Sequence, residues 1–178
     1  MEETNQIETR RTVLFRGQSL TLLGNELKTE EKAPNFRVLD NEMMPMKFRR
    51  TYSGKTAVIL SLPSLDTSVC DIETRRFNRE AEKMGPNVEI LAVSMDLPFA
   101  QKRWCGAANI QRVKTYSDHL KADFGKSYGV LVKELRLLAR AVFIIDKSGT
   151  VKYVQLVPEI TDEPDYESAL GALKQMVK

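Results

Sequence analysis

The feature that most constrains this chain is an unbroken apolar run at residues 56–62 that ends at Pro63. The run does not alternate with polar residues, and this predicts a strand buried on both faces, as in a parallel sheet. Pro63 has no N–H group to donate to a neighbouring strand, so we expect the strand to end there. Thr67 and Ser68 then offer side-chain oxygens suited to capping a helix. Gly85, followed by a proline, predicts the end of that helix.

Cys70 falls in the first turn of the expected helix. Unpaired backbone N–H groups and the positive end of the helix dipole lie at this position. They favour the thiolate, which is the reactive form of cysteine. The only histidine, His119, follows Asp118, which we expect to cap a helix running to Phe124. Since His119 is then an exposed first-turn residue, we expect the helix terminus and a cation, not an imidazole, to activate Cys70. The alternative is that Cys70 is a small core residue.

A second unbroken apolar run, at residues 88–94, predicts a strand parallel to the first and a right-handed strand–helix–strand unit. The other expected elements are, in chain order, a hairpin of strands at 12–15 and 19–23, short strands at 33–40 and 43–48, a helix at 98–108, a strand at 113–116, the helix at 118–124, an antiparallel hairpin of 139–146 and 151–157, and a helix at 166–177. Together they predict the α/β class, with a mixed central sheet flanked by helices and an N-terminal β-hairpin. We expect residues 1–178 to form one domain, with residues 1–10 flexible.

The composition argues against several functions. The 178 residues include 27 basic and 24 acidic side chains, and the difference of +3 is too small to indicate a nucleic-acid partner. No apolar run approaches the ~20 residues that span a bilayer, and the acidic, polar N-terminus does not resemble a secretory signal. We therefore expect a cytoplasmic protein with no membrane partner. Two cysteines and one histidine fit neither a disulfide-rich scaffold nor a metal site.

Three pairs of neighbouring basic residues have two possible interpretations. We interpret them as solvated faces, and an anion site is the alternative. The pairs are Arg10–Arg11, Arg49–Arg50 and Arg75–Arg76.

Pro63, Thr67 and Cys70 resemble the Pro-x-x-x-Thr/Ser-x-x-Cys motif of peroxiredoxins. Five further segments are similar to the bacterial thiol peroxidase branch of that family, and they are residues 64–67, 96–101, 103–107, 139–142 and 158–166. The resemblance extends from about Thr12 to the C-terminus and implies a thioredoxin-like fold. One segment departs from the family pattern, because residues 132–138 lack the glycines usual before the arginine-bearing strand. That departure concerns the rim of the site.

The resemblance also implies the roles of individual residues. Cys70 corresponds to the peroxidatic cysteine, Cys105 to the resolving cysteine and Arg140 to the active-site arginine. The implied enzyme reduces hydrogen peroxide and alkyl hydroperoxides, forms a Cys70–Cys105 disulfide and is recycled by thioredoxin. The family further implies a homodimer without a cofactor or metal.

These residue types suit peroxide chemistry. A thiolate attacks one oxygen of the O–O bond, and the site must stabilise both the thiolate and the charge on the leaving oxygen. Helix N–H groups and the fixed cation of Arg140 can do so. Thr67 can orient the peroxide, and Pro63 can exclude water. The alternatives are a structural ion pair between Arg140 and Glu73, and an inert buried thiol at Cys105.

The two cysteines are expected to lie apart in the reduced protein. Cys105 comes seven residues after Pro98 and therefore lies ~10 Å along its helix. A disulfide needs Cα atoms within ~7 Å, so we expect local unwinding before the bond can form.

Three other functions are compatible with parts of this pattern. A redox sensor could use the same disulfide to change partner binding. A thioredoxin-like dithiol oxidoreductase would need a Cys-x-x-Cys pair, which is missing. A catalytically inactive scaffold would not need Pro63, Thr67, Cys70 and Arg140 together.

Overall fold

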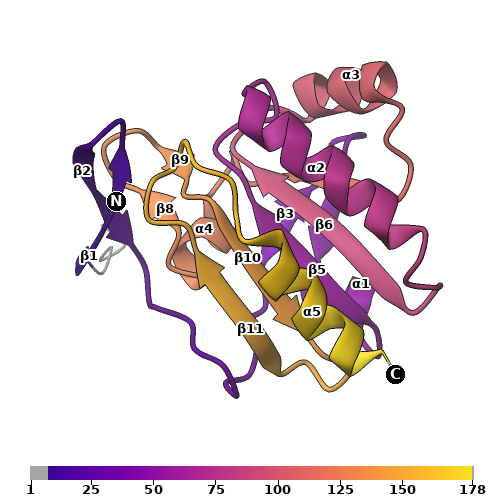
Figure 1. The fold of residues 1–178 in the computed structure, drawn as a ribbon. Coiled ribbons are helices and arrows are strands. Elements are labelled where there is room, and N and C mark those ends of the chain that lie inside the picture. The colour runs from indigo at the N-terminus through magenta and orange to yellow at the C-terminus, as the bar shows by residue number, and fades with distance from the viewer. Residues whose placement is uncertain (1–7, 178) are drawn as a thin grey trace.

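A computed structural model describes residues 8–177, and its larger sheet is mixed (Figure 1). Three central strands are parallel, namely β5 (Thr56–Ser61), β6 (Val88–Ser94) and β7 (Val113–Ser117). On one side β5 pairs antiparallel with β10 (Ala141–Ile145), which pairs antiparallel with β11 (Val151–Leu156). On the other side β7 is followed by β3 (Arg37–Leu39) and β4 (Pro45–Lys47). All six residues of β5 are buried, as the unbroken apolar run predicted.

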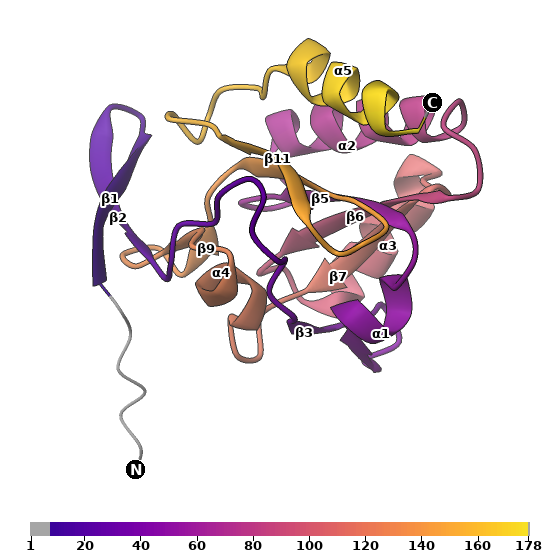
Figure 2. The same ribbon diagram turned by 90° about the horizontal axis from the view of Figure 1, so that it is seen from below.

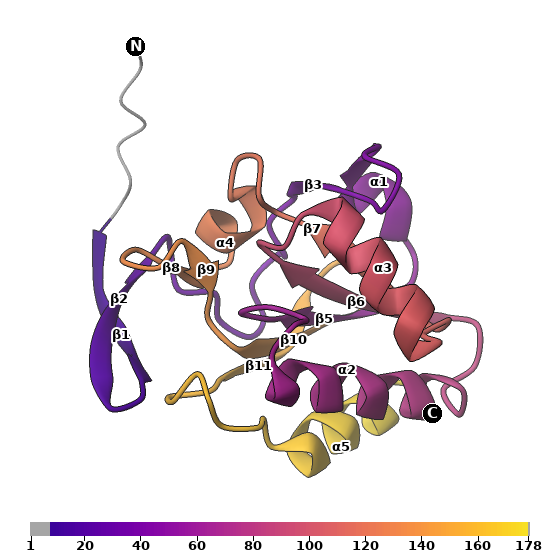
Figure 3. The same ribbon diagram turned by 90° about the horizontal axis from the view of Figure 1, so that it is seen from above.

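Helices cover both faces of this sheet (Figures 2 and 3). One face carries α2 (Ser68–Ala81), α3 (Pro98–Ala108) and α5 (Tyr166–Met176), and the other carries α1 (Phe48–Tyr52) and α4 (Asp123–Ser127). Side chains of β5 alternate between the two faces, with Val58 and Leu60 in one hydrophobic cluster and Ala57 and Ile59 in the other. The expected α/β fold with flanking helices is confirmed.

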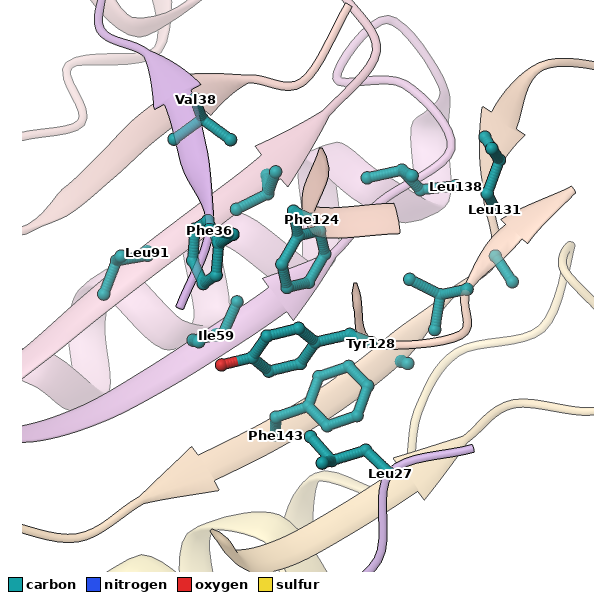
Figure 4. Close-up of a cluster of buried hydrophobic side chains, with 14 of the residues drawn as sticks. Leu27, Phe36, Val38, Ile59, Leu91, Phe124, Tyr128, Leu131, Leu138 and Phe143 are labelled. Atoms are coloured by element: carbon teal, nitrogen blue, oxygen red, sulfur yellow. The ribbon is translucent and has the colours of Figure 1, made fainter. Parts of the chain in front are cut away.

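The second cluster has an aromatic centre (Figure 4). The rings of Phe36 and Phe48 stack with their centroids 4.8 Å apart, and Phe36 also meets Phe124 edge-on at 5.0 Å. Tyr128 packs against Phe143 of β10 at 5.1 Å. These contacts hold the two short helices against the sheet, where neither would be stable alone.

The N-terminal hairpin is part of a second, four-stranded sheet. Its strands are β1 (Glu8–Phe15), β2 (Gln18–Leu23), β8 (Leu131–Val132) and β9 (Leu137–Leu138). Arg16 and Gly17 both have positive φ, at 51° and 78°, as a tight two-residue hairpin turn requires. The hairpin is confirmed, and its pairing to β8 was not predicted.

The hairpin also contacts the chain after β11. The N–H of Leu14 donates to the carbonyl of Pro158 at 2.7 Å, and the N–H of Ile160 donates to the carbonyl of Leu14 at 2.8 Å. Residues 131–138 and 158–160 are therefore both held by the N-terminal hairpin.

Three local predictions need correction. Residues 1–7 lie outside the described part of the chain, but Glu8–Arg10, expected to be flexible, belong to β1. The predicted strand at 43–48 ends at Lys47, and Phe48 begins α1 because its ring packs into the aromatic cluster.

The third correction concerns the helix predicted from Asp118. α4 begins at Asp123, and the carboxylate of Asp118 reaches forward to accept the N–H groups of Phe124 and Gly125 at 3.1 and 2.8 Å. Asp118 therefore does cap a helix, but from five residues upstream of it. His119 lies in the intervening turn, half-buried, with Nδ1 2.9 Å from the hydroxyl of Ser117.

Within residues 8–177, no helix combines the length and apolar character needed to cross a bilayer.

Candidate active site

Cys70 is the third residue of α2, and the helix follows the carboxyl end of β5 after a short loop. This is the first-turn position predicted from the sequence, so Cys70 lies at the positive end of the dipole of a 14-residue helix. Its exposed fraction is 0%, and it packs with Leu62 and Leu65 at the edge of the hydrophobic cluster beneath α2. The sulfur is therefore not in contact with solvent in this structure.

Arg140 lies directly against this thiol. Its Nη1 is 3.3 Å from the Sγ of Cys70 and 2.7 Å from the Oε2 of Glu73, one helical turn further along α2. Its Nε donates to the carbonyl of Ile160 at 3.0 Å. Both the active-site contact and the alternative ion pair with Glu73 are therefore present, and they share one nitrogen.

Burial affects the pKa values of Glu73 and Arg140. Arg140 and Glu73 have exposed fractions of 1% and 0%. Burial raises the pKa of Glu73 to about 7, and the charge and hydrogen bond of Arg140 limit that rise. Burial disfavours the charged form of Arg140, but the charges of Cys70 and Glu73 outweigh it and raise the pKa of Arg140. The guanidinium therefore remains a fixed cation beside the sulfur.

The loop that holds Pro63 and Thr67 is tied down by Asp96. The Asp96 carboxylate accepts the hydroxyl of Ser64 at 2.7 Å and the N–H of Leu65 at 2.8 Å. Pro63 is buried, as a residue that excludes water should be. Sequence reasoning missed this role of Asp96 in the loop. The signal was available, because residues that follow two neighbouring parallel strands lie at the same edge of the sheet.

Thr67 occupies the N-cap position, but its hydroxyl does not cap the helix. The side chain is exposed, and its Oγ1 donates to the carbonyl of Ser64 at 2.9 Å. This bond leaves the lone pairs of the hydroxyl available to accept a hydrogen bond from a ligand at the start of α2.

Cys105 is engaged elsewhere. It lies on α3, half-buried, with its Sγ 3.3 Å from the Oγ1 of Thr115, whose hydroxyl donates to the Oδ1 of Asn41 at 3.0 Å. Burial raises the pKa of Cys105, and the hydrogen bonds of Thr115 and Asn41 oppose the rise. Both cysteines are free thiols, as expected for the reduced protein.

Arg75 joins α2 to α3. Its Nη1 donates to the carbonyl of Ala108 at 3.1 Å, and its guanidinium lies 5.9 Å from the ring centroid of Trp104. The side chain also bonds Asp71 at 2.9 Å. This contact fixes the last turn of α3, which carries Cys105.

The geometry supports one kind of chemistry at Cys70. A thiol in the first turn of a helix, next to an arginine that is always charged, is placed where a small electrophile could be attacked and the resulting charge stabilised. Glu73 and the carbonyl of Ile160 keep the guanidinium in place.

Comparisons with known proteins identify relatives of the whole chain. The family model for Redoxin matches residues 28–170. The chain is 52% identical to a thiol peroxidase of Halalkalibacterium halodurans, over 92% of this chain and 97% of that protein. It is 48% identical to a thiol peroxidase of Bacillus subtilis, over 93% and 98%. A crystal structure of a peroxiredoxin-like protein from Aquifex aeolicus is 44% identical, with a TM-score of 0.86 over 96% of this chain and 99% of that one.

Proposed function

The chain belongs to the Redoxin family and is a thiol-dependent peroxidase of the peroxiredoxin type, and we propose that Cys70 is the residue that reduces the hydroperoxide. The observation that carries this proposal is the 3.3 Å approach of Arg140 Nη1 to Cys70 Sγ in the first turn of α2. The guanidinium and the helix N–H groups stabilise the thiolate and the charge that develops on oxygen.

The first half-reaction oxidises Cys70. Its thiolate attacks one peroxide oxygen, the O–O bond breaks, and the electron pair leaves with the second oxygen, which takes a proton to become water or an alcohol. The enzyme is left with a sulfenic acid. Thr67 orients the peroxide through its exposed hydroxyl, and Pro63 keeps bulk water out. Because Cys70 is fully buried, peroxide enters when residues 63–67 move.

The second half-reaction uses Cys105. Its thiolate attacks the sulfenic sulfur, the S–O bond breaks, the oxygen leaves as hydroxide and takes a proton from solvent to become water, and a Cys70–Cys105 disulfide forms. Cys105 first has to leave Thr115, and α3 has to unwind locally, since its thiol is hydrogen-bonded to β7 and not to Cys70. Thioredoxin then reduces the disulfide. We further propose that the enzyme works as a cytoplasmic antioxidant homodimer on hydrogen peroxide and alkyl hydroperoxides, with no cofactor or metal.

A coupled assay tests the proposal. Peroxide-dependent oxidation of NADPH is followed in the presence of thioredoxin and its reductase, using the unaltered protein and the Cys70→Ser and Cys105→Ser variants. Cys70→Ser should neither support NADPH oxidation nor consume peroxide in a single turnover. Cys105→Ser should stop turning over, yet still consume one equivalent of peroxide in a single turnover.

Two results would contradict the proposal. Turnover by Cys70→Ser would remove Cys70 from the reaction. Full turnover by Cys105→Ser would indicate a one-cysteine mechanism and would remove Cys105 from the cycle.

A further inference from the structure

A cavity lies at the end of the large sheet opposite Cys70. β5 and β10 pair from Ala141↔Ser61, beside Arg140, to Ile145↔Ala57, and the cavity opens beyond the latter pair. Four residues of strand place it ~14 Å from the active-site end of the sheet. Figure 1 shows α1 and the turn after β10 at this opposite end. The cavity is therefore separate from the peroxide site.

The cavity has a volume of about 390 Å³ and two walls, which come from segments far apart in the sequence. One wall is formed by α1 and the turn after it, residues 48–55, and carries Arg49 and Lys55. The other is formed by residues 145–149 with Lys32 beside them, and carries Lys147. The volume lies within the range of ~300–1,000 Å³ typical of small-molecule sites.

The charge of the lining is strongly one-sided. It contains four basic side chains and one carboxylate, Asp146. The Oδ1 of Asp146 already accepts the N–H groups of Ser148 and Thr150 at 2.8 and 3.0 Å. These hydrogen bonds, with Lys152, outweigh the effect of burial and hold the pKa of Asp146 below its ordinary value. The carboxylate therefore stays charged and offsets one of the four cations, so the lining keeps a net positive charge.

Three of the four cations have no acidic partner within the described part of the chain. Lys55 pairs with Glu89 at 2.5 Å. Lys32 donates to neutral oxygens only, the carbonyl of Ser148 at 3.1 Å and the hydroxyl of Thr150 at 3.2 Å. Arg49 Nη2 donates to the carbonyl of Ala33 at 3.2 Å, and the side chain of Lys147 is exposed. Most of the guanidinium donors of Arg49, and the ammonium of Lys147, are available to a ligand.

Two glycines leave the backbone of both walls uncovered. Gly54 and Gly149 have φ of 77° and 78°, a conformation that other residues rarely adopt. A Cβ built on either would meet no atom within 4 Å, so open space lies beyond each. A ligand can therefore approach the main chain closely at both turns.

We propose that this cavity binds a small molecule that carries at least two phosphate groups. Arginine presents a planar set of donors that matches phosphate oxygens, and lysine adds point charges. Because unpaired cations stand on both walls, a ligand with two separated anionic groups satisfies them better than a single anion. Of the two interpretations of the Arg49–Arg50 pair, the anion site fits Arg49, which lines the cavity, and does not fit Arg50, which lies outside the lining.

Calorimetric titration with inorganic pyrophosphate at fixed ionic strength tests the proposal. The Arg49→Gln/Lys147→Gln variant should bind at least about tenfold more weakly, since hydrogen bonds to charged groups are the strong ones. The matched control is Arg50→Gln/Lys28→Gln, which removes the same charge from exposed side chains that do not line the cavity. It should bind like the unaltered protein. Lys147→Gln alone, which disturbs no contact of the fold, should already weaken binding severalfold.

Backbone NMR locates the ligand. Pyrophosphate should shift the amide signals of Gly54 and Gly149, and peroxidase activity of all the variants should stay unchanged. The proposal is overturned if pyrophosphate does not bind at millimolar concentration, or if the two double variants lose affinity equally. It is also overturned if sulfate binds as tightly as pyrophosphate, because that would indicate nonspecific attraction to positive charge.

Discussion

Removing the charge of Arg140 should destabilise the protein through Glu73 and inactivate it through Cys70. In Arg140→Gln, the Oε2 of Glu73 loses its partner at 2.7 Å, and Oε1 has none among the described residues. Because Glu73 is fully buried and Arg140 limits the rise of its pKa, the loss leaves a buried acid that must either take up a proton or stay charged without compensation. Breaking such a pair costs about 3–5 kcal/mol. For a chain of 178 residues this corresponds to a fall in Tm of roughly 6–20 °C.

The partner variant separates the two effects. Glu73→Gln keeps an oxygen that accepts from Arg140, and the guanidinium keeps its bond to the carbonyl of Ile160. We expect a smaller cost, about 1.5–3 kcal/mol. In the Arg140→Gln/Glu73→Gln double variant neither charge is buried, so much of the stability lost in Arg140→Gln should return. The coupling energy between the two positions should fall at the upper end of the ~0.5–3 kcal/mol found for residues in contact.

Urea denaturation of the four reduced proteins measures this cycle, and rapid mixing with hydrogen peroxide measures oxidation of Cys70. The double variant should regain stability but not its rate of oxidation, which should remain ~10²–10³-fold low because the cation at the sulfur is gone. Additive losses of stability would show that the buried pair is not coupled. A double variant that reacts at the normal rate would refute the role of Arg140 in catalysis.

Three other predictions concern α3, a buried acid and two glycines. Gly106→Ala, whose Cβ meets no atom within 4 Å, should stabilise α3 by about 0.5–1 kcal/mol and slow disulfide formation, whereas Arg75→Gln should speed it by freeing the last turn. Fluorescence of the single tryptophan follows this step, and unchanged rates in both variants would contradict local unwinding. Burial raises the pKa of Asp118 from 3.8 to about 7, so its contribution to stability is complete below about pH 4 and is lost as the pH rises towards 7. In Asp118→Asn the free energy of unfolding, measured by urea titration, should differ less between pH 4.5 and pH 7.5 than in the unaltered protein. An equal difference in both proteins would exclude this carboxyl as the source of the pH dependence. Gly24→Ala should lower Tm, because φ is 93° and the new Cβ would overlap a backbone carbonyl, while Gly171→Ala within α5 should not; equal shifts would refute the argument.

Most of the fold follows from local patterns in the sequence. The bounds predicted for the strand at 88–94 and the helix at 98–108 are those observed, because an unbroken apolar run and a proline at the first helical position are strong local signals. The position of Cys70 in the first turn of α2 came from the same reasoning. The approach of Arg140 to Cys70 did not, because it joins positions 70 residues apart, and only the resemblance to peroxiredoxins suggested it.

The features that were missed depend on contacts between distant segments. Phe48, the first residue of α1, was predicted as the end of a strand, and it begins a helix because its ring and that of Tyr52 complete an aromatic cluster built from elsewhere in the chain. Asp118 serves a helix that begins five residues later, which no local capping rule anticipates. Asp96 bonds to a loop about thirty residues earlier in the sequence.

The N-terminal hairpin has a practical consequence for anyone handling this enzyme. It contains no reacting group, yet β2 pairs with β8 shortly before Arg140, and Leu14 binds the segment whose Ile160 carbonyl orients the guanidinium. Trimming or cleaving the first 23 residues should therefore cost peroxidase activity while both thiols remain titratable. A purification tag is better attached after α5, and a loss of activity during storage should first be checked by mass spectrometry for clipping near the amino terminus.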